Sequence, residues 1–231
     1  MRTGSGSKKT RVLVIAAHPD DEVLGCGAAM AWHAAQGEEV RTLILTDGAG
    51  GRYARAMRKT LRDSAQRSAR ILGIEGVTFL DLPNQGLDTL PITDVAQAVE
   101  KILADLRPQV VYTHHKGDLN RDHRIAYEAT MVACRPLPGC PVARLLTYYV
   151  PSSSDYHEVD AESVFVPNVF LDAKRYLRRK LNAFLCYRSE VKAFPHPRSP
   201  EALEAYSRAW GVRVGLESAE PFRLIREIGG D

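Results

Sequence analysis

Apolar residues along the first half of the chain occur in two alternating patterns. Short continuous apolar runs, typical of strands buried on both faces, occur at 11–17, 40–46, 77–82 and 109–114. Each run is followed by apolar residues at helical spacing, which predict helices at 23–36, 54–72, 92–106 and 121–133. Thr93 is a candidate N-cap of the third of these helices. Strands and helices that alternate with short connections predict an α/β fold, with a doubly wound, mainly parallel sheet flanked by helices.

The second half of the chain has a less regular pattern. Apolar runs predict strands at 143–149, 164–172 and 221–228, and helical spacing predicts helices at 174–192 and 200–210. Residues 1–10, MRTGSGSKKT, contain no apolar run. We therefore expect a flexible N-terminal tail over residues 1–10, followed by a single domain over residues 11–231.

A polar cluster follows the first predicted strand, where the sequence reads IAAHPDDE over residues 15–22. Carboxylates at the end of a buried strand repel one another and are costly to remove from water unless a positive partner lies beside them. Further polar clusters, ILTDG and YTHHKGD, follow the second and fourth predicted strands. Because ligands bind beyond the carboxyl ends of the strands in doubly wound sheets, these clusters are expected to meet at one edge.

A divalent metal ion is the positive partner that this pattern favours. His18 and Asp21 have the spacing H-x-x-D, and HHKGDLNRDH at 114–123 supplies further imidazoles and carboxylates from another strand end. Two imidazole nitrogens and one carboxylate oxygen around an open position are a frequent ligand set of catalytic zinc. Histidines at ligand spacing favour zinc over magnesium. We therefore expect Zn²⁺ at this edge, with another divalent metal as the alternative.

The two motifs at the strand ends resemble those of a known family. AHPDDE after the first strand and DLNRDH after the fourth resemble the LmbE-like/PIG-L family of metal-dependent N-deacetylases. The resemblance covers most of the chain, through LG at 72–73, PNQGLD at 83–88 and a G-x-x-x-G-x-x-x-A-E-x-F pattern from Gly211 to Phe222. Members of this family remove an acetyl group from an N-acetylated amino sugar or its conjugate, and the resemblance implies a Rossmann-like sheet.

The resemblance also implies a role for each residue of the first motif. Zinc would be bound by His18, Asp21 and His123, where it would polarise the amide carbonyl and acidify the attacking water. Asp20, next to the ligands but not expected to bind the metal, would act as the general base that takes the proton of this water. Glu22 is expected to anchor the loop.

The second motif is expected to stabilise the negative charge that develops on the carbonyl oxygen. Many family members have His-Pro-Asp-His here, whereas this chain has Asn120, which can donate a hydrogen bond but cannot carry a proton. Oxyanion stabilisation is therefore assigned to zinc with Asn120, or to His115 from the preceding turn. Of His114 and His115, one is expected to be buried support and the other to face the pocket. Asp122 is expected to orient a neighbouring donor.

Two further positions are candidates for substrate binding. Arg52 follows the second strand and could contact a substrate hydroxyl or phosphate, or could equally be a solvated arginine. Asn84 stands where an aspartate often follows Leu-Pro in the family, and Ser64 stands where a glutamate is frequent. These departures leave the identity of the substrate open. Specificity is expected to come from the loops after the second and third strands and from the irregular second half.

Composition narrows the classes of function. A formal net charge of +3 over 231 residues is small for a dedicated nucleic-acid-binding protein, and the arginine-rich stretch 52–70 is expected to be a solvated helix face. Four cysteines without C-x-x-C spacing indicate reduced thiols in a cytoplasmic protein. No apolar run is long enough to cross a membrane and no signal peptide is visible, which also favours the cytoplasm. The sequence leaves a homo-oligomer open.

The function favoured by these observations is a zinc-dependent hydrolase that removes an acetyl group from a small-molecule substrate, an N-acetylated amino sugar or sugar conjugate. An amidase of a thiol conjugate would use the same metal centre and is one alternative. A non-hydrolytic nucleotide-binding or sensor module is the alternative from another class, because doubly wound sheets often bind nucleotides. The first turn, IAAHPDDEVLGCG, lacks a G-x-G-x-x-G directly after the strand, which counts against nucleotide binding.

Overall fold

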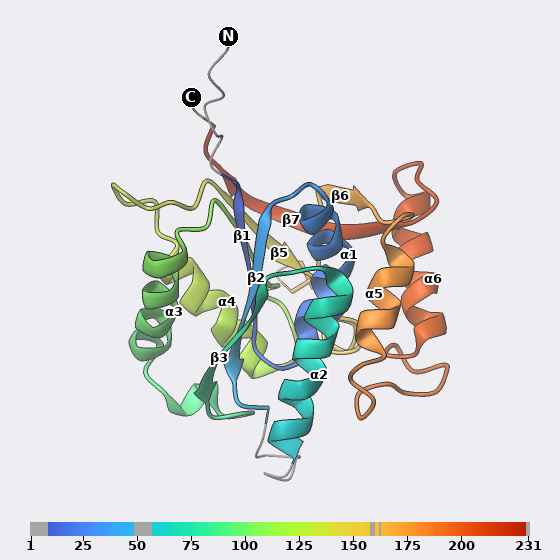
Figure 1. The fold of residues 1–231 in the computed structure, drawn as a ribbon, viewed down its shortest axis with the longest axis horizontal. Helices are drawn as coiled ribbons and strands as arrows, with labels where there is room; N and C mark the ends of the chain where they lie inside the picture. Colours follow the sequence, from blue (N-terminus) through green and yellow to red (C-terminus); the bar gives the residue numbers. More distant parts are fainter. Residues whose placement is uncertain (1–8, 49–56, 158–159, 162, 230–231) are drawn as a thin grey trace.

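The computed structural model describes residues 9–48, 57–157, 160–161 and 163–229. The seven strands of this part of the chain form one sheet in the order β3-β2-β1-β4-β5-β7-β6 (Figure 1). Neighbours from β3 to β5 pair in parallel, whereas β7 pairs antiparallel with β5 and with β6. The doubly wound, mainly parallel fold class is confirmed. The strands are β1 (Arg11–Ala16), β2 (Glu39–Thr46), β3 (Gly76–Leu82), β4 (Val110–His114), β5 (Arg144–Tyr148), β6 (Val169–Asp172) and β7 (Ala219–Glu227).

Helices cover both faces of this sheet. They are α1 (Asp21–Ala35), α2 (Met57–Leu72), the short 3₁₀ helix η1 (Leu87–Thr89), α3 (Ile92–Leu106), α4 (Arg121–Ala133), α5 (Leu177–Phe184) and α6 (Pro200–Val212). Figure 1 shows α3 and α4 on one face and α1, α2, α5 and α6 on the other. Successive side chains of β1 point to opposite faces. Val12 and Val14 therefore join the core formed with α1 and α2, whereas Leu13 and Ile15 join the core formed with α3 and α4.

Two predicted elements of the second half are shorter than expected. The predicted strand at 164–172 begins only at Val169, because Pro167 lacks the N–H that a strand ladder requires. The predicted helix at 174–192 is restricted to α5. Beyond α5 the Tyr187 side chain is fully buried in the core, so tertiary packing overrides the helical pattern there.

Helix α3 begins differently from the prediction. Pro91, not Thr93, precedes its first residue, and proline suits this place because N–H groups at a helix start have no partner within the helix. Thr93 lies inside the helix, with its hydroxyl 3.5 Å from a carboxylate oxygen of Asp94. The predicted cap was therefore wrong, although the range 92–106 coincides with α3.

The remaining expectations about the whole chain have separate outcomes. All four cysteines are free thiols. Within the described ranges, no helix is both long and apolar enough to cross a membrane. The strands of the irregular second half, β5 to β7, extend the sheet that the first four strands begin. The expected tail at 1–10 lies outside the described residues except for its last two, and its flexibility stays a prediction.

The order of the strands reverses at β1. From β1 the chain continues through β2 to β3 on one side, and it then returns to place β4 and β5 on the other side of β1. Such a reversal opens a crevice at the carboxyl ends of the two central strands. Helix α1 begins at Asp21 after the loop that follows β1, and α4 begins at Arg121 after the loop that follows β4. The two loops and the two helix starts therefore meet at this crevice.

Candidate metal centre

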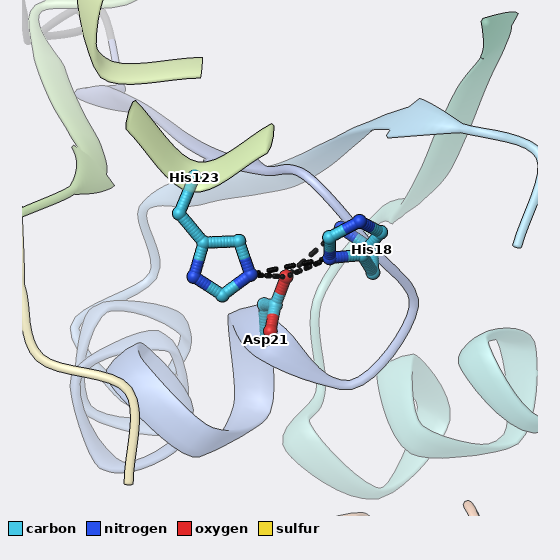
Figure 2. Close-up of side chains that lie close together, drawn as sticks. All are labelled: His18, Asp21 and His123. Atoms are coloured by element: carbon cyan, nitrogen blue, oxygen red, sulfur yellow. Dashed lines mark hydrogen bonds and ion pairs between the residues drawn. The ribbon is translucent and has the colours of Figure 1, made fainter. Parts of the chain in front are cut away.

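The three predicted ligands come together at the crevice (Figure 2). His18 lies in the loop after β1, Asp21 is the first residue of α1, and His123 lies in the first turn of α4. His18 Nδ1 lies 3.1 Å from Asp21 Oδ2 and 3.2 Å from His123 Nε2. His123 Nε2 lies 3.1 Å from the same carboxylate oxygen. The three potential ligand atoms therefore converge on one point.

The outer ring nitrogens of both histidines face carboxylates. His18 Nε2 lies 3.0 Å from Asp122 Oδ2, and His123 Nδ1 lies 3.2 Å from Asp118 Oδ2. Because a carboxylate accepts hydrogen bonds, the outer nitrogens carry an N–H, which leaves the inner nitrogens as the ones that could bind a metal. The second oxygen of Asp21, Oδ1, is buried and has no hydrogen-bond partner within the described part of the chain. This donor set fits a divalent metal held by two imidazoles and one carboxylate.

The charges around these side chains favour a cation. Burial lowers the pKa of His123, but the carboxylates of Asp21 and Asp118 outweigh burial and raise this pKa to about 10. Burial raises the pKa of Asp21, but His123 and His18 outweigh it and hold this pKa well below its usual range. The side chains of Asp21 and His123 are each 1 % exposed, so little water screens their charges. Positive charge is therefore stabilised at the point where the ligand atoms converge.

His114 is the last residue of β4 and His115 follows it, and the two side chains have different partners. His114 is fully buried, stacks on His123 with ring centroids 4.0 Å apart, and accepts a hydrogen bond from the Ala17 N–H at 2.8 Å. Burial lowers the pKa of His114 well below its usual value, so this ring is neutral support for the site. His115 Nε2 instead donates to the carbonyl oxygen of Ser163 at 2.7 Å. His115 is not among the described residues that line the cavity beside the ligands, and its role as an oxyanion donor stays a prediction.

A cavity of about 600 Å³ opens beside two of the three ligands, His18 and Asp21. This volume lies within the range of roughly 300 to 1,000 Å³ that is typical of small-molecule sites. Of the other residues predicted from sequence, Asp20, Asn84 and Asn120 line the cavity, and Arg52 lies outside the described residues. The second half of the chain contributes lining side chains that no motif indicated, namely Ser152, Ser153, Tyr156, Glu190, Lys192, His196 and Arg198.

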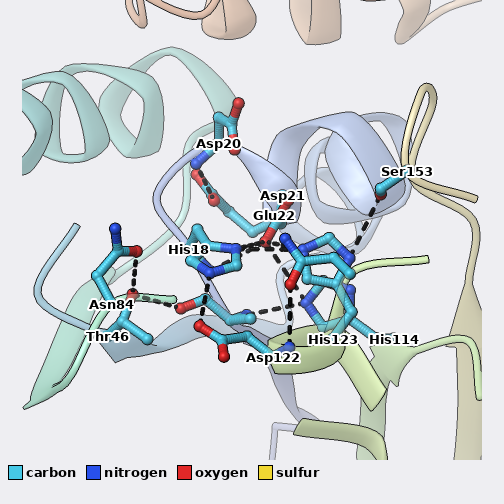
Figure 3. A network of polar contacts seen from close by, with 12 residues as sticks. His18, Asp20, Asp21, Glu22, Thr46, Asn84, His114, Asp122, His123 and Ser153 are labelled. Atoms are coloured by element: carbon cyan, nitrogen blue, oxygen red, sulfur yellow. Dashed lines mark hydrogen bonds and ion pairs between the residues drawn. The ribbon is translucent and has the colours of Figure 1, made fainter. Parts of the chain in front are cut away.

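Asp20 occupies the turn between β1 and α1 (Figure 3). Its φ of 115° is a left-handed conformation that residues other than glycine rarely adopt. The Asp20 N–H donates to Glu22 Oε2 at 3.0 Å, and Glu22 also accepts a hydrogen bond from the Tyr187 hydroxyl, so Glu22 ties the loop to the core. Arg198 Nη1 donates to Asp20 Oδ2 at 3.0 Å. Burial raises the pKa of Asp20 well above its usual value, and Arg198 opposes this rise.

Two asparagines line the cavity with part of their amide groups already engaged. Asn120 caps α4, because its Oδ1 accepts a hydrogen bond from the Asp122 N–H at 2.9 Å. This cap directs the amide oxygen toward the helix, so Nδ2 is the end that remains for a ligand. Asn84, which is 8 % exposed, accepts a hydrogen bond from Thr46 Oγ1 at 3.3 Å.

Asp118 is a site residue that the sequence analysis did not single out. It is fully buried, and its Oδ2 accepts hydrogen bonds from Ser153 Oγ at 3.0 Å and Ser154 Oγ at 2.7 Å. The same oxygen faces His123 Nδ1. The available signal was the D-x-N-x-D-H spacing, which places this carboxylate in the same strand-end loop as the third ligand.

Replacing Asp118 with asparagine is expected to lower metal affinity about 10- to 100-fold, as is usual when the partner of a metal-bound histidine is lost. Asparagine keeps the shape of the side chain but removes the charge that holds the outer N–H of His123. Competition with a chelator of known affinity measures the change. Ser154→Ala, which removes one donor to the same carboxylate, is the matched control and should have a smaller effect. Equal affinity of Asp118→Asn and the unchanged protein would contradict this role.

A family model and a curated relative both match this chain. The model of the PIG-L family, described as GlcNAc-PI de-N-acetylase, matches residues 13–134, a range that contains all three potential ligands. The uncharacterised deacetylase YaiS of Escherichia coli (strain K12) is 31 % identical over 191 residues, covering 80 % of this chain and 94 % of YaiS.

Two further relatives have named reactions. Diacetylchitobiose deacetylase of Thermococcus kodakarensis is 27 % identical over 238 residues, covering 94 % of this chain and 84 % of that protein. 4-Oxalmesaconate hydratase of Pseudomonas putida is 28 % identical over 201 residues, covering 75 % of this chain and 71 % of that protein. Among solved structures, the conserved protein TT1542 of Thermus thermophilus has a TM-score of 0.73 at 29 % identity, over 95 % of this chain and 96 % of that one.

Proposed function

Because the chain belongs to the PIG-L family of de-N-acetylases, we propose that it is a zinc-dependent hydrolase that removes the acetyl group from an N-acetylated amino sugar or its conjugate. One observation carries this proposal. Two imidazoles and one carboxylate converge on a single point beside a cavity that is also lined by a second carboxylate, that of Asp20. The relative from Thermococcus kodakarensis, which deacetylates diacetylchitobiose, supports the sugar part of the proposal.

His18, Asp21 and His123 are the residues that would hold the metal. Zinc supplies a Lewis acid that polarises an amide carbonyl and acidifies water. The chain itself contributes the orientation of the ligands, because Asp122 fixes the ring of His18 and Asp118 fixes the ring of His123. Each imidazole thereby keeps one tautomer and one rotamer.

Asp20 is the residue proposed to move the proton. It directly precedes the ligand Asp21 and lines the same cavity. As a carboxylate it can accept the proton of the attacking water and later donate that proton to the leaving amine. Its side chain is only 3 % exposed, so bulk water competes little for that proton.

Asn120 is proposed to stabilise the negative charge that develops on the carbonyl oxygen. Its Nδ2 remains for the cavity because its Oδ1 caps α4. A donor held in place before the reaction begins needs no reorganisation as the charge forms. The amide of Asn120 does not titrate, so Asp20 is the residue that would transfer the protons.

Replacing Asn120 with serine is expected to lower kcat about 10²- to 10³-fold with little change in KM, since an oxyanion donor acts mainly in the transition state. Serine retains an N-cap oxygen, so α4 and its ligand His123 should stay in place. Asn120→Ala loses the donor and the cap together, and the difference between the two variants isolates the cap. Steady-state kinetics with metal analysis make the measurement. An unchanged kcat in Asn120→Ser would leave oxyanion stabilisation to the metal alone.

Acetate release by the zinc-loaded enzyme across a panel of compounds tests the proposed function. The panel contains N-acetylglucosamine, diacetylchitobiose and a conjugate of N-acetylglucosamine, together with a mercapturate for the thiol-conjugate amidase alternative. We expect equal amounts of acetate and free amine from at least one N-acetylated sugar, with activity lost on chelation and restored by zinc. Release from the mercapturate alone would assign the amidase reaction instead. Hydration of 4-oxalmesaconate without acetate release would assign the reaction of the Pseudomonas putida relative.

We also propose a cytoplasmic location, because all four cysteines are free thiols and a reducing compartment keeps them so. Fractionation of cells that express the protein tests this location, and recovery outside the cytoplasm would contradict it. The homo-oligomer stays a prediction that light scattering on the purified protein can test.

A further inference from the structure

Arg198 reaches the cavity from the segment before α6. It lies 178 positions from Asp20 in the sequence, yet its Nη1 donates to Asp20 Oδ2 at 3.0 Å. The side chains of Arg198 and Asp20 are 19 % and 3 % exposed, so water has little access to the contact. Arg198 and Asp20 therefore form a charge-assisted hydrogen bond that water screens less than a surface ion pair.

Several contacts in turn hold Arg198. In the guanidinium, Nε donates to Ser152 Oγ at 3.1 Å and Nη1 lies 3.5 Å from Glu190 Oε2. The main-chain N–H of Arg198 donates to His196 Nδ1 at 3.0 Å. The next residue, Ser199, is the N-cap of α6 and fixes the backbone at the helix start. The guanidinium is therefore held in one position by its neighbours, unlike that of an exposed arginine.

Asp20 depends on its surroundings because its backbone is in a left-handed conformation, with φ at 115°. Such a conformation persists in a non-glycine residue only where neighbouring groups impose it. Glu22 binds the main chain of Asp20 through the N–H. Within the described part of the chain, Arg198 is the only hydrogen-bond donor to the Asp20 carboxylate, and it engages Oδ2. The other carboxylate oxygen, Oδ1, accepts no hydrogen bond from these residues.

We propose that Arg198 is a positioning residue for the reaction, which binds Oδ2 of Asp20 and leaves Oδ1 to take the proton of the attacking water. This inference rests on the proposed function, in which Asp20 is the general base. In this step the O–H bond of water breaks as a new O–H bond forms at Oδ1, and the oxygen of that water adds to the amide carbonyl. Arginine suits the role better than lysine because its planar fork can contact Asp20, Ser152 and Glu190 together.

Arg198→Gln is the first test, measured by steady-state kinetics and metal analysis. We expect kcat to fall about 10²-fold, the usual cost of misplacing a catalytic group by about 1 Å. KM and zinc content should stay close to those of the unchanged enzyme, which a general loss of structure would not allow. Arg198→Lys keeps the charge without the fork and should have an intermediate kcat. Arg208→Gln is the matched control and should keep full activity, because Arg208 lies on α6 and pairs with Glu204 on the same helix.

A double-mutant cycle with Asp20→Asn then separates positioning of the base from any other role of Arg198. When the base is absent, Arg198→Gln should cause no further loss of kcat, because no carboxylate remains to be positioned. The same loss in both backgrounds would overturn the inference, as would full kcat in zinc-loaded Arg198→Gln. If Arg198→Gln does not fold, Arg198→Lys serves in the same cycle. An unchanged enzyme that releases no acetate from any compound would show that the proposed function itself has failed, and the inference with it.

Discussion

Replacing His123 with alanine is expected to abolish stoichiometric zinc binding and to lower stability at the same time. Three protein ligands leave no spare donor, so the loss in affinity should exceed the about 10- to 100-fold that follows from losing a partner of a ligand. Stability should fall because His123 lies between the buried carboxylates of Asp21 and Asp118, which would lose their common cationic partner. Metal analysis after dialysis and thermal unfolding measure the two effects.

His18→Ala separates the loss of metal from the loss of stability. The His18 side chain is 12 % exposed, compared with 1 % for His123, so its removal should destabilise the fold less. Zinc should be lost in both variants. His33→Gln is the matched control, because His33 is also buried but contacts Glu38 and the Tyr112 hydroxyl away from the site. Full zinc in both ligand variants, or loss of zinc in the control, would show that the site has been assigned to the wrong residues.

The first half of the fold could be predicted because its periodicity and its tertiary role agree. The ranges 92–106 and 121–133 coincide with α3 and α4, whose apolar faces pack against the sheet. The potential metal ligands came from the same agreement, since both motifs follow buried strands that the fold places side by side, as β1 and β4. A short motif at a strand end is therefore informative when the order of the strands is known.

The remainder of the site could not be read from local patterns. Arg198 and Glu190 lie in the irregular stretch between α5 and α6, where no periodicity indicates which side chains turn inward. His114 and His115 show a second limit, because the sequence does not indicate which of two adjacent histidines packs against the ligand His123, and in the structure it is His114. Asp20 shows a third limit, because tertiary contacts, and not the conformational preference of aspartate, set its left-handed backbone.

Replacing Asp20 with asparagine is expected to lower kcat by about 10² to 10⁴, the usual contribution of a positioned general base, while zinc and substrate still bind. Asparagine is the suitable replacement because it tolerates a left-handed backbone better than alanine does, and Asp20 has φ at 115°. Its amide oxygen can still accept the hydrogen bond of Arg198. Shape, backbone and one contact are therefore kept, and the ability to take a proton is removed.

The pH dependence of kcat/KM gives a second readout of the same variant. Asp20 acts as a base only while it is charged, so the unchanged enzyme should lose activity as the pH falls through the pKa of this carboxyl. Asparagine does not titrate, and this acidic limb should disappear from the weak residual activity. Turnover near that of the unchanged enzyme in a zinc-loaded variant would exclude Asp20 as the base and leave the metal site intact. Loss of zinc from the variant would instead show that Asp20 is the metal ligand and that Asp21, its neighbour, has the catalytic role.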